Sequence, residues 1–349
     1  VKTAKRTTVN TTIPSPFYKK QEVTDSYNQL ELIFNKNFKL QFRAYNEAMA
    51  YRFSDTGKQP FNVVSEEATF HFDGDRSAYF PYVKTGTDIT SQFFNSFENI
   101  YQYGKLTAMD TTRLVFTPIV VEVSNTGKKL CIAEADVESY PGMFLLNKDA
   151  STTLNGLFAP LPQKTIVGGH NDLQKVPQTY HNYLAACQAG RSFPWRIAIV
   201  TEKDTQLADN DIVYRLASPS RLEDISWIKP GKVAWEWWNH WGVYDVDFQA
   251  GVNNKTYMAY IDFASRHGIE YVILDEGWAV NMKADLFQVV PEIDLKELAA
   301  YAKSKNVDLI LWAGYYAFDR DMEKVCKHYS AMGVKGFKVD FMDRDDQEM

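Results

Sequence analysis

Asp340 is the residue of this chain best suited by its position to do chemistry. It ends a short apolar segment that starts at Gly336, and Lys338 lies two residues earlier, on the same side of an extended strand. A nearby ammonium group favours the ionised form of a carboxylate, which is the form that a nucleophile needs. The alternative is a structural role, in which Asp340 caps a helix or only pairs with Lys338. The same design recurs in other segments, which favours the chemical role.

A second acidic segment end is formed by Asp275 and Glu276, with Trp278 close behind. Carboxylates can accept hydrogen bonds from sugar hydroxyls, and the face of an indole can pack against a pyranose ring. Adjacent side chains of an extended chain point to opposite sides, so we predict that Asp275, rather than Glu276, faces the cavity. The alternative is an ordinary loop with a helix-capping aspartate.

Tryptophans crowd the end of a third segment. Half of the chain's 8 tryptophans lie within seven residues, at Trp235, Trp237, Trp238 and Trp241. Some of them must belong to a core, because alternate residues of a barrel strand face the interior and the surrounding helices. We predict that Trp235 or Trp237 shapes a sugar site, whereas Trp312 is expected to pack rather than to contact a ligand.

Four segments of one design must bring these residues together. Each is short and apolar and ends in polar or aromatic residues; they lie at 233–238, 271–278, 308–315 and 336–343. Parallel strands that alternate with helices form (β/α) barrels, whose active sites lie at the carboxyl ends of the strands. Tryptophans and carboxylates at such a face suit the binding of sugars.

The stretches between these segments have the pattern of helices. One helix is predicted over about 255–267, capped by one of the asparagines at 253 and 254. The next follows Asp294 and ends before Asn306, and a third runs over about 319–332. A closed barrel needs eight strands, so we expect this sequence to be a piece of a longer protein.

The first part of the chain has the pattern of a β-rich domain. Many short strands separated by Asn, Asp and Gly turns predict a large sandwich of antiparallel sheets over residues 1–217. Residues 218–231 are predicted to be a linker, and residues 232–349 the first half of the barrel. Because the chain starts at Val1 rather than Met, we expect that a leader and part of the N-terminal domain are missing.

The composition excludes several classes of protein. The net charge of −6 is spread along the chain without a basic stripe, so nucleic acid is not an expected partner. No apolar run is long enough to span a membrane. The 3 cysteines form no zinc motif or disulfide framework. Glu134 follows an apolar run, but a calcium ion needs more oxygen ligands than one acidic strand end supplies.

With these residues in view, the chain resembles glycoside hydrolase family 97 over most of its length. The motifs that carry the resemblance are Ala-Met-Ala-Tyr-Arg-Phe at 48–53, Glu-Ala-Asp at 134–136, Tyr-Pro-Gly-Met at 140–143, Arg-Ser-Phe-Pro-Trp-Arg at 191–196, the Trp-rich segment, Leu-Asp-Glu-Gly-Trp at 274–278 and Lys-Val-Asp-Phe-Met-Asp-Arg-Asp-Asp-Gln at 338–347. The resemblance implies an N-terminal β-super-sandwich, a catalytic (β/α)8 TIM-type barrel and calcium beside the substrate, with Glu134 as one calcium ligand. It also implies a bacterial protein that is periplasmic or secreted.

The resemblance also implies a way to distinguish two branches of the family. The retaining α-galactosidases have an aspartate at the fourth barrel strand, and the inverting α-glucosidases lack a carboxylate there. Asp340 therefore predicts a retaining, exo-acting α-galactosidase that hydrolyses terminal α-galactosides, with Asp275 and Lys338 binding the sugar. The acid/base carboxyl is expected beyond Met349, so we expect this chain alone to be inactive. The alternatives are an inverting α-glucosidase and a non-catalytic carbohydrate-binding protein.

Overall fold

The computed structural model describes residues 1–123, 127–280, 282 and 285–349, which divide into two compact units. The first unit comprises Val1–Lys164, Thr179–Glu223 and Asp343–Met349, and the second comprises Thr165–Gln178 and Asp224–Met342. This division differs from the predicted contiguous domains, since residues 165–178 group with the second unit and residues 343–349 with the first.

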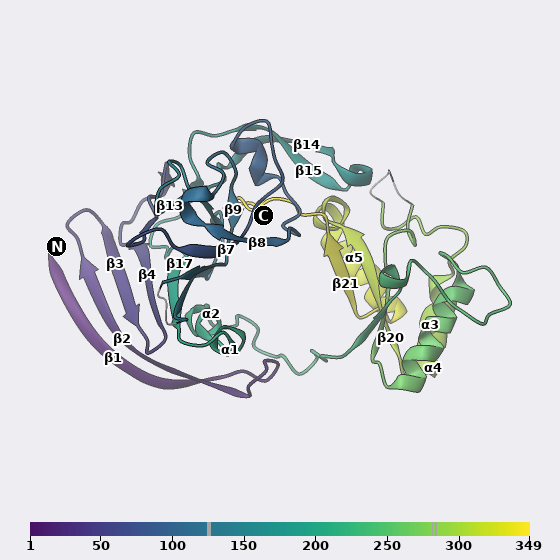
Figure 1. Ribbon diagram of the computed structural model, residues 1–349. Helices are drawn as coiled ribbons and strands as arrows, with labels where there is room; N and C mark the ends of the chain where they lie inside the picture. Colours follow the sequence, from purple (N-terminus) through teal and green to yellow (C-terminus); the bar gives the residue numbers. More distant parts are fainter. Residues whose placement is uncertain (124–126, 281, 283–284) are drawn as a thin grey trace. The chain divides into compact units, whose positions relative to one another are not determined.

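The largest element of the first unit is an antiparallel nine-stranded sheet (Figure 1). Its strands, in spatial order, are β1 (Thr3–Pro14), β2 (Glu22–Ile33), β3 (Phe38–Ala44), β4 (Ala48–Asp55), β17 (Trp195–Thr201), β11 (Lys129–Ala135), β10 (Ile119–Glu122), β7 (Ser77–Pro81) and β8 (Tyr101–Lys105). The sequence did not predict β1, because its side chains are polar and mostly exposed. This strand is held by its pairing with β2 along twelve residues.

Two smaller sheets and a few short helices complete the first unit. They are the four-stranded sheet of β6 (Thr69–His71), β13 (Thr153–Phe158), β12 (Met143–Leu146) and β9 (Val115–Phe116), the pair β5 (Phe61–Val63) and β16 (Ala185–Cys187), the α-helices α1 (Thr205–Ala208) and α2 (Ile212–Leu216), and the 3₁₀ turns Thr90–Phe93 and Leu106–Ala108. Ile119 and Ile132 of the large sheet share one buried cluster with Met143 and Leu154 of the four-stranded sheet. The two sheets therefore enclose a common apolar core.

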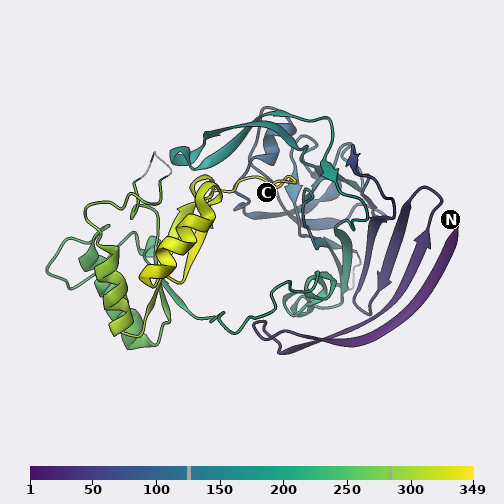
Figure 2. The ribbon, with the colours of Figure 1, turned by 180° about the vertical axis from the view of Figure 1, so that it is seen from behind.

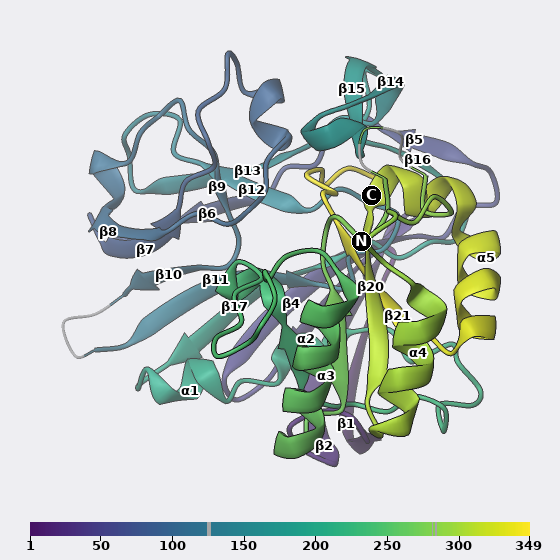
Figure 3. The same ribbon diagram turned by 90° about the vertical axis from the view of Figure 1, so that its right-hand side faces the viewer.

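The second unit is built on a parallel four-stranded sheet in the order β18 (Val233–Trp235), β19 (Tyr271–Leu274), β20 (Asp308–Gly314) and β21 (Gly336–Asp340). The helices α3 (Asn254–His267) and α4 (Leu295–Ser304) lie side by side over these strands (Figure 3). Tyr257, Ile261 and Leu298 pack from the helices into the same core as Val272, Leu274 and Leu311 of the strands. The predicted β-α-β-α-β-α-β order is confirmed.

The helix ends follow from local capping. Asn253 Oδ1 accepts the backbone N–H of Thr256 at the start of α3, and Gly268 ends that helix with φ +61°. Asp294 accepts the N–H groups of Lys296 and Glu297 at the start of α4. Both helices therefore begin where the sequence predicts.

The third helix and the strand lengths differ from the prediction. Helix α5 (Tyr315–Met332) begins four residues before the predicted start, with a kink at Asp321. The predicted strand over 233–238 ends at Trp235, because a 3₁₀ turn (Glu236–Asn239) follows. Apolar content alone does not distinguish a strand end from the turn that follows it.

Strands β14 (Pro162–Gly168) and β15 (Gln174–Tyr180) form a hairpin, and the 3₁₀ turn His170–Asp172 lies at its tip. The tip, within residues 165–178, belongs to the second unit. Figure 2 shows this tip beside the first turn of α5. Leu173 lies in the core of the second unit, and its carbonyl accepts the N–H of Tyr316 at 2.9 Å. Gly314 allows this approach, since a Cβ there would lie 2.6 Å from Leu173 Cδ2.

Among the helices that the structure describes, none combines the length and the apolar content needed to cross a membrane.

Candidate active site

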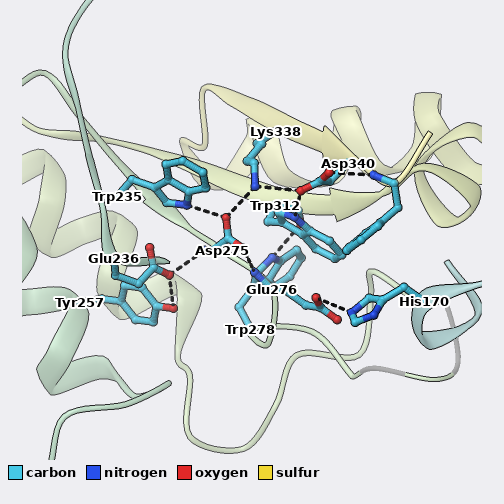
Figure 4. Close-up of polar contacts among 11 residues, drawn as sticks. His170, Trp235, Glu236, Tyr257, Asp275, Glu276, Trp278, Trp312, Lys338 and Asp340 are labelled. Atoms are coloured by element: carbon cyan, nitrogen blue, oxygen red, sulfur yellow. Dashed lines mark hydrogen bonds and ion pairs between the residues drawn. The ribbon is translucent and has the colours of Figure 1, made fainter. Parts of the chain in front are cut away.

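Lys338 joins the carboxylates of Asp275, which follows β19, and Asp340, which ends β21; β20 lies between these two strands (Figure 4). Its Nζ lies 2.9 Å from Asp340 Oδ2 and 2.9 Å from Asp275 Oδ2. The side chain of Asp275 is 6% exposed, whereas that of Asp340 is 39% exposed. The buried carboxylate is therefore a structural partner of the lysine, and the open one can meet a ligand.

The sheet register explains why these residues meet. In the pairing of β20 with β21, Trp312 lies opposite Lys338, and Gly314 lies opposite Asp340. Strand β19 ends at Leu274, so Asp275 emerges at the same edge of the parallel sheet. The register thus brings Asp275 and Lys338 beside Asp340. The predicted contact of Asp275 with a sugar stays a prediction, and the 6% exposure of this side chain does not favour it.

Both oxygens of Asp340 accept hydrogen bonds. Besides Lys338, Oδ2 accepts the indole N–H of Trp312 at 3.1 Å, and Oδ1 accepts the backbone N–H of Phe341 at 2.8 Å. Burial alone would raise the pKa of Asp340, but the hydrogen bonds from Lys338, Trp312 and Phe341 outweigh it, and the pKa is lowered. Asp340 is therefore held in the ionised form.

Trp312 was expected only to pack. It is 4% exposed, as a packing residue should be, but its indole N–H reaches Asp340 directly. Phe341, the other donor, was also missed; its φ of +59° lies in the left-handed region, which costs non-glycine residues roughly 1–2 kcal/mol. Neither feature could be read from residue type, because the Trp312 contact depends on the pairing of β20 with β21, and the Phe341 contact depends on a local backbone angle.

Lys338 is also placed over an aromatic ring. Its Nζ lies 4.4 Å from the ring centroid of Trp235, whose indole N–H donates to Asp275 Oδ2 at 2.5 Å. Burial would lower the pKa of Lys338, but the hydrogen bonds and charges of Asp340 and Asp275 raise it. The lysine therefore remains a cation.

The predicted tryptophans separate into three environments. Trp235 lies within the cluster around Lys338, and Trp237 is 50% exposed. Trp278 is fully buried: its indole N–H donates to the carbonyl of Trp312 at 2.9 Å, and its ring meets the edge of Tyr329. The prediction that Trp278 offers a face to a sugar therefore needs correction, because that ring is covered by the core.

Glu236 is a buried acid that the sequence reasoning did not single out. It is 1% exposed; its Oε1 accepts the hydroxyl of Tyr257 at 2.8 Å and the backbone N–H of Asp275 at 2.7 Å. Its Oε2 is buried without a partner among the described residues. Burial raises the pKa of Glu236 to about 7, so the group retains its proton well above the ordinary range.

Glu276 points away from Lys338, as the alternation of side chains predicts. Its Oε1 accepts the amide N–H of Asn171 at 2.6 Å, and its Oε2 lies 3.2 Å from His170 Nε2. The ring of His170 stacks on Phe341 at 4.5 Å and 25°. These contacts join the hairpin tip to the strand ends, and no sequence motif indicated them.

Glu134, the predicted calcium ligand, lies in the first unit and has both oxygens engaged. Its Oε1 accepts the N–H of Met143 at 2.8 Å, and its Oε2 meets Arg196 Nη1 at 2.5 Å. Arg196 also forms a two-bond pair with Glu66. Within the described part of the chain, no three or more His, Cys, Asp or Glu side chains form a group that could hold a metal ion. These residues by themselves do not fit calcium, which needs six to eight oxygen ligands.

The acidic residues after Asp340 are not the solvated loop that such a cluster usually forms. Arg344 and Asp346 are 4% and 5% exposed and form a two-bond ion pair. Burial first, and then the charge of Glu134, raises the pKa of Asp345 to about 6. In the first unit, therefore, two carboxyl groups with raised pKa values lie close to each other.

Two family profiles match most of the chain. A profile for the N-terminal region of glycosyl hydrolase 97 matches residues 1–219, and one for glycoside hydrolase 97 matches residues 237–349. A retaining α-galactosidase from Bacteroides thetaiotaomicron is 57% identical over 346 residues, which cover 99% of this chain and 52% of that protein. The chain thus spans about half the length of this curated relative.

Solved structures share the fold. A glycoside hydrolase family 97 enzyme from Pseudoalteromonas sp. strain K8, solved in complex with acarbose, has a TM-score of 0.76 at 21% identity and covers 98% of this chain and 51% of its own. A β-arabinopyranosidase has a TM-score of 0.72 at 22% identity and covers 99% of this chain and 54% of its own. The two profile matches show that the chain belongs to glycoside hydrolase family 97.

Proposed function

We propose that the protein to which this chain belongs is a retaining, exo-acting α-galactosidase with Asp340 as its nucleophile. The observation that carries the proposal is the state of Asp340, which is held ionised by Lys338 and is still 39% exposed at a strand end. The 57% identity to a protein named a retaining α-galactosidase supports the choice of substrate and stereochemistry.

In the first step, a carboxylate oxygen of Asp340 would attack the anomeric carbon of the terminal galactose. The bond from that carbon to the leaving oxygen breaks, and its electron pair stays on the leaving oxygen, which takes a proton from a general acid. Water then attacks the anomeric carbon, loses a proton to the same group, and releases Asp340 as a carboxylate with net retention.

The two oxygens of Asp340 differ in the number of hydrogen bonds that they accept, which indicates the oxygen that attacks. Asp340 Oδ2 accepts from both Lys338 and Trp312, whereas Oδ1 accepts only from Phe341 among the described residues. An oxygen with fewer donors keeps more free electron density. We therefore assign the attack to Oδ1.

The remaining groups would bind and orient the sugar. The Lys338 ammonium has three N–H donors and gives two to Asp275 and Asp340, so the third can meet a sugar hydroxyl. Asp275 holds this lysine in place, and the ring of Trp235 borders it. Trp237, which is half exposed, offers an apolar face for the substrate.

Membership of the family supports proposals for the domains, the acid/base group and the location of the full-length enzyme. Strands β18 to β21 would be the first four of a (β/α)8 barrel, and the first unit would be the β-super-sandwich. The acid/base carboxyl would lie on a later barrel strand, so we expect these 349 residues alone to be inactive. A bacterial periplasmic or secreted location fits a glycosidase that meets external oligosaccharides.

Calcium stays a prediction for the full-length protein. Glu134 is engaged by Arg196 and Met143, so further oxygen ligands would have to come from outside the described residues. Bound calcium would supply charge stabilisation beside the acid region, and no step above passes through it.

The test uses the full-length protein and its Asp340→Ala variant with p-nitrophenyl α-galactoside. We expect turnover to be lost and azide to restore it, with β-galactosyl azide as product. Asp308→Ala, at the opposite end of the adjacent strand β20, is the matched control and should retain activity. Unchanged turnover in Asp340→Ala would rule out the nucleophile.

The product anomer separates the retaining enzyme from its relatives. NMR of the first product should show α-galactose, while an initial β anomer, or preference for an α-glucoside, would point to an inverting α-glucosidase. Binding of galactose without turnover would point to a carbohydrate-binding protein.

A further inference from the structure

The tip of the β14–β15 hairpin is anchored to the second unit at several points. Leu173 is 3% exposed in the core of that unit, and its carbonyl accepts the N–H of Tyr316. Lys175 Nζ lies 2.5 Å from Asp319 Oδ2 on helix α5. The tip residues are therefore held in a defined place beside the carboxyl end of β20.

This anchoring fixes the imidazole of His170. Its Nε2 lies 3.2 Å from Glu276 Oε2, and Asn171 binds the other oxygen of the same carboxylate. The Glu276 side chain is 15% exposed, so this carboxylate is a largely buried support for the tip. The His170 side chain itself is 49% exposed, and its contact with Glu276 orients one edge of the ring.

The face of the His170 ring lies against Phe341, the residue that follows Asp340. His170 stacks on Phe341 with ring centroids 4.5 Å apart, and Trp312 meets Phe341 edge-on at 5.9 Å. Phe341 has a positive φ of +59°, a conformation that needs surrounding contacts to persist. In this conformation its N–H donates to Asp340 Oδ1 at 2.8 Å.

We propose that His170 is a positioning residue for Asp340: its ring holds Phe341 in place, so that the Phe341 N–H directs Asp340 Oδ1 toward the anomeric carbon. The effect on the reaction rests on the proposed function of Asp340, but the effect on the Phe341 backbone does not. Displacement of a reacting atom by a fraction of an ångström is enough to slow an enzyme.

Two substitutions in the full-length protein separate the ring from its polar edge. His170→Phe keeps a ring that can stack and loses the contact with Glu276, whereas His170→Gln keeps a polar group and loses the ring. His181→Ala is the matched control, because His181 is also stacked on an aromatic ring (Tyr183, 4.6 Å) but lies in the first unit.

Kinetics give the first readout. For p-nitrophenyl α-galactoside we expect kcat/KM to fall about tenfold or more in His170→Gln and by less than about threefold in His170→Phe. Inhibition by free galactose should stay within about twofold in both, because Lys338, the proposed sugar-binding group, is untouched. Equal loss in both variants, loss only in His170→Phe, or no loss in either would overturn the proposal.

Hydrogen exchange gives a second readout that does not require activity. The Phe341 amide, followed by mass spectrometry of a peptide covering 336–342, should exchange several-fold faster in His170→Gln than in wild type, His170→Phe or His181→Ala. Unchanged exchange in His170→Gln would overturn the positioning role. If wild type hydrolyses no α-galactoside while this difference is present, the proposed function fails and the positioning role stands.

Discussion

Glu236 holds the backbone of Asp275: its Oε1 accepts the Asp275 N–H at 2.7 Å across the ends of two neighbouring strands. The acid is 1% exposed, and burial raises its pKa to about 7 from an ordinary 4.5. A buried carboxyl group that keeps its proton thus supports the carboxylate that binds Lys338. This arrangement makes stability depend on pH.

Glu236→Gln should remove part of that dependence. Because the folded-state pKa is raised, the stabilising contribution is fully present below about pH 4.5 and is lost as the pH rises to about 7. The loss is on the order of 3 kcal/mol. Glutamine keeps the acceptor and does not titrate, so its Tm relative to wild type should increase from acidic to alkaline pH.

The measurement is thermal unfolding of the full-length protein across this pH range. Glu292→Gln, at an exposed position, is the control and should give a constant difference. A Glu236→Gln difference that does not change with pH would contradict the buried, protonated state.

Lys338→Met should change both the rate and its pH dependence. Without the ammonium group, Asp340 loses its closest cation and its pKa should rise, so the acidic limb of kcat/KM should move to higher pH. We also expect a loss of about 10²-fold or more at neutral pH. The check is a pH–rate profile over about pH 4 to 9, with the exposed Lys335→Met as control. A profile with an unmoved acidic limb would argue against this coupling.

Trp312→Phe should slow the reaction with little change in fold. The substitution keeps a ring in the core and removes the indole N–H that donates to Asp340 Oδ2. A hydrogen bond to a charged group contributes roughly 1.5–3 kcal/mol, which corresponds to about ten- to a hundredfold in kcat/KM. Steady-state kinetics test this, and Trp227→Phe, at an exposed tryptophan, should be neutral. Wild-type kinetics in Trp312→Phe would show that the bond does not affect the nucleophile.

Trp278→Phe should destabilise the protein without weakening sugar binding. The ring is fully buried and its N–H bonds to the carbonyl of Trp312, so its truncation should cost about 2–4 kcal/mol. Thermal unfolding and inhibition by galactose, measured together, separate the two effects. An unchanged Tm with a large loss of galactose affinity would restore the sugar contact that the sequence suggested.

The features that depend on local chemistry could be predicted from the order of the residues alone. The caps Asp294 and one of the two asparagines at 253 and 254 were predicted, because a side-chain oxygen can meet a backbone N–H two or three residues later without help from the fold; the structure shows that the asparagine is Asn253. The spacing of Lys338 and Asp340 placed both on one side of a strand. The motifs at 274–278 and 338–347 indicated the family, which the profile matches confirm.

The set of side chains around the candidate nucleophile could not be predicted, because it depends on how distant segments pack. Trp312, within β20, and Trp278, four residues after β19, both lie in the core, yet the indole N–H of Trp312 donates to Asp340 and that of Trp278 donates to a backbone carbonyl. His170 lies 170 residues before Asp340 in the chain, and only the docking of Leu173 brings its ring to Phe341. Residue type and spacing carry no information about contacts between distant segments, because these depend on how whole elements pack to bury apolar surface.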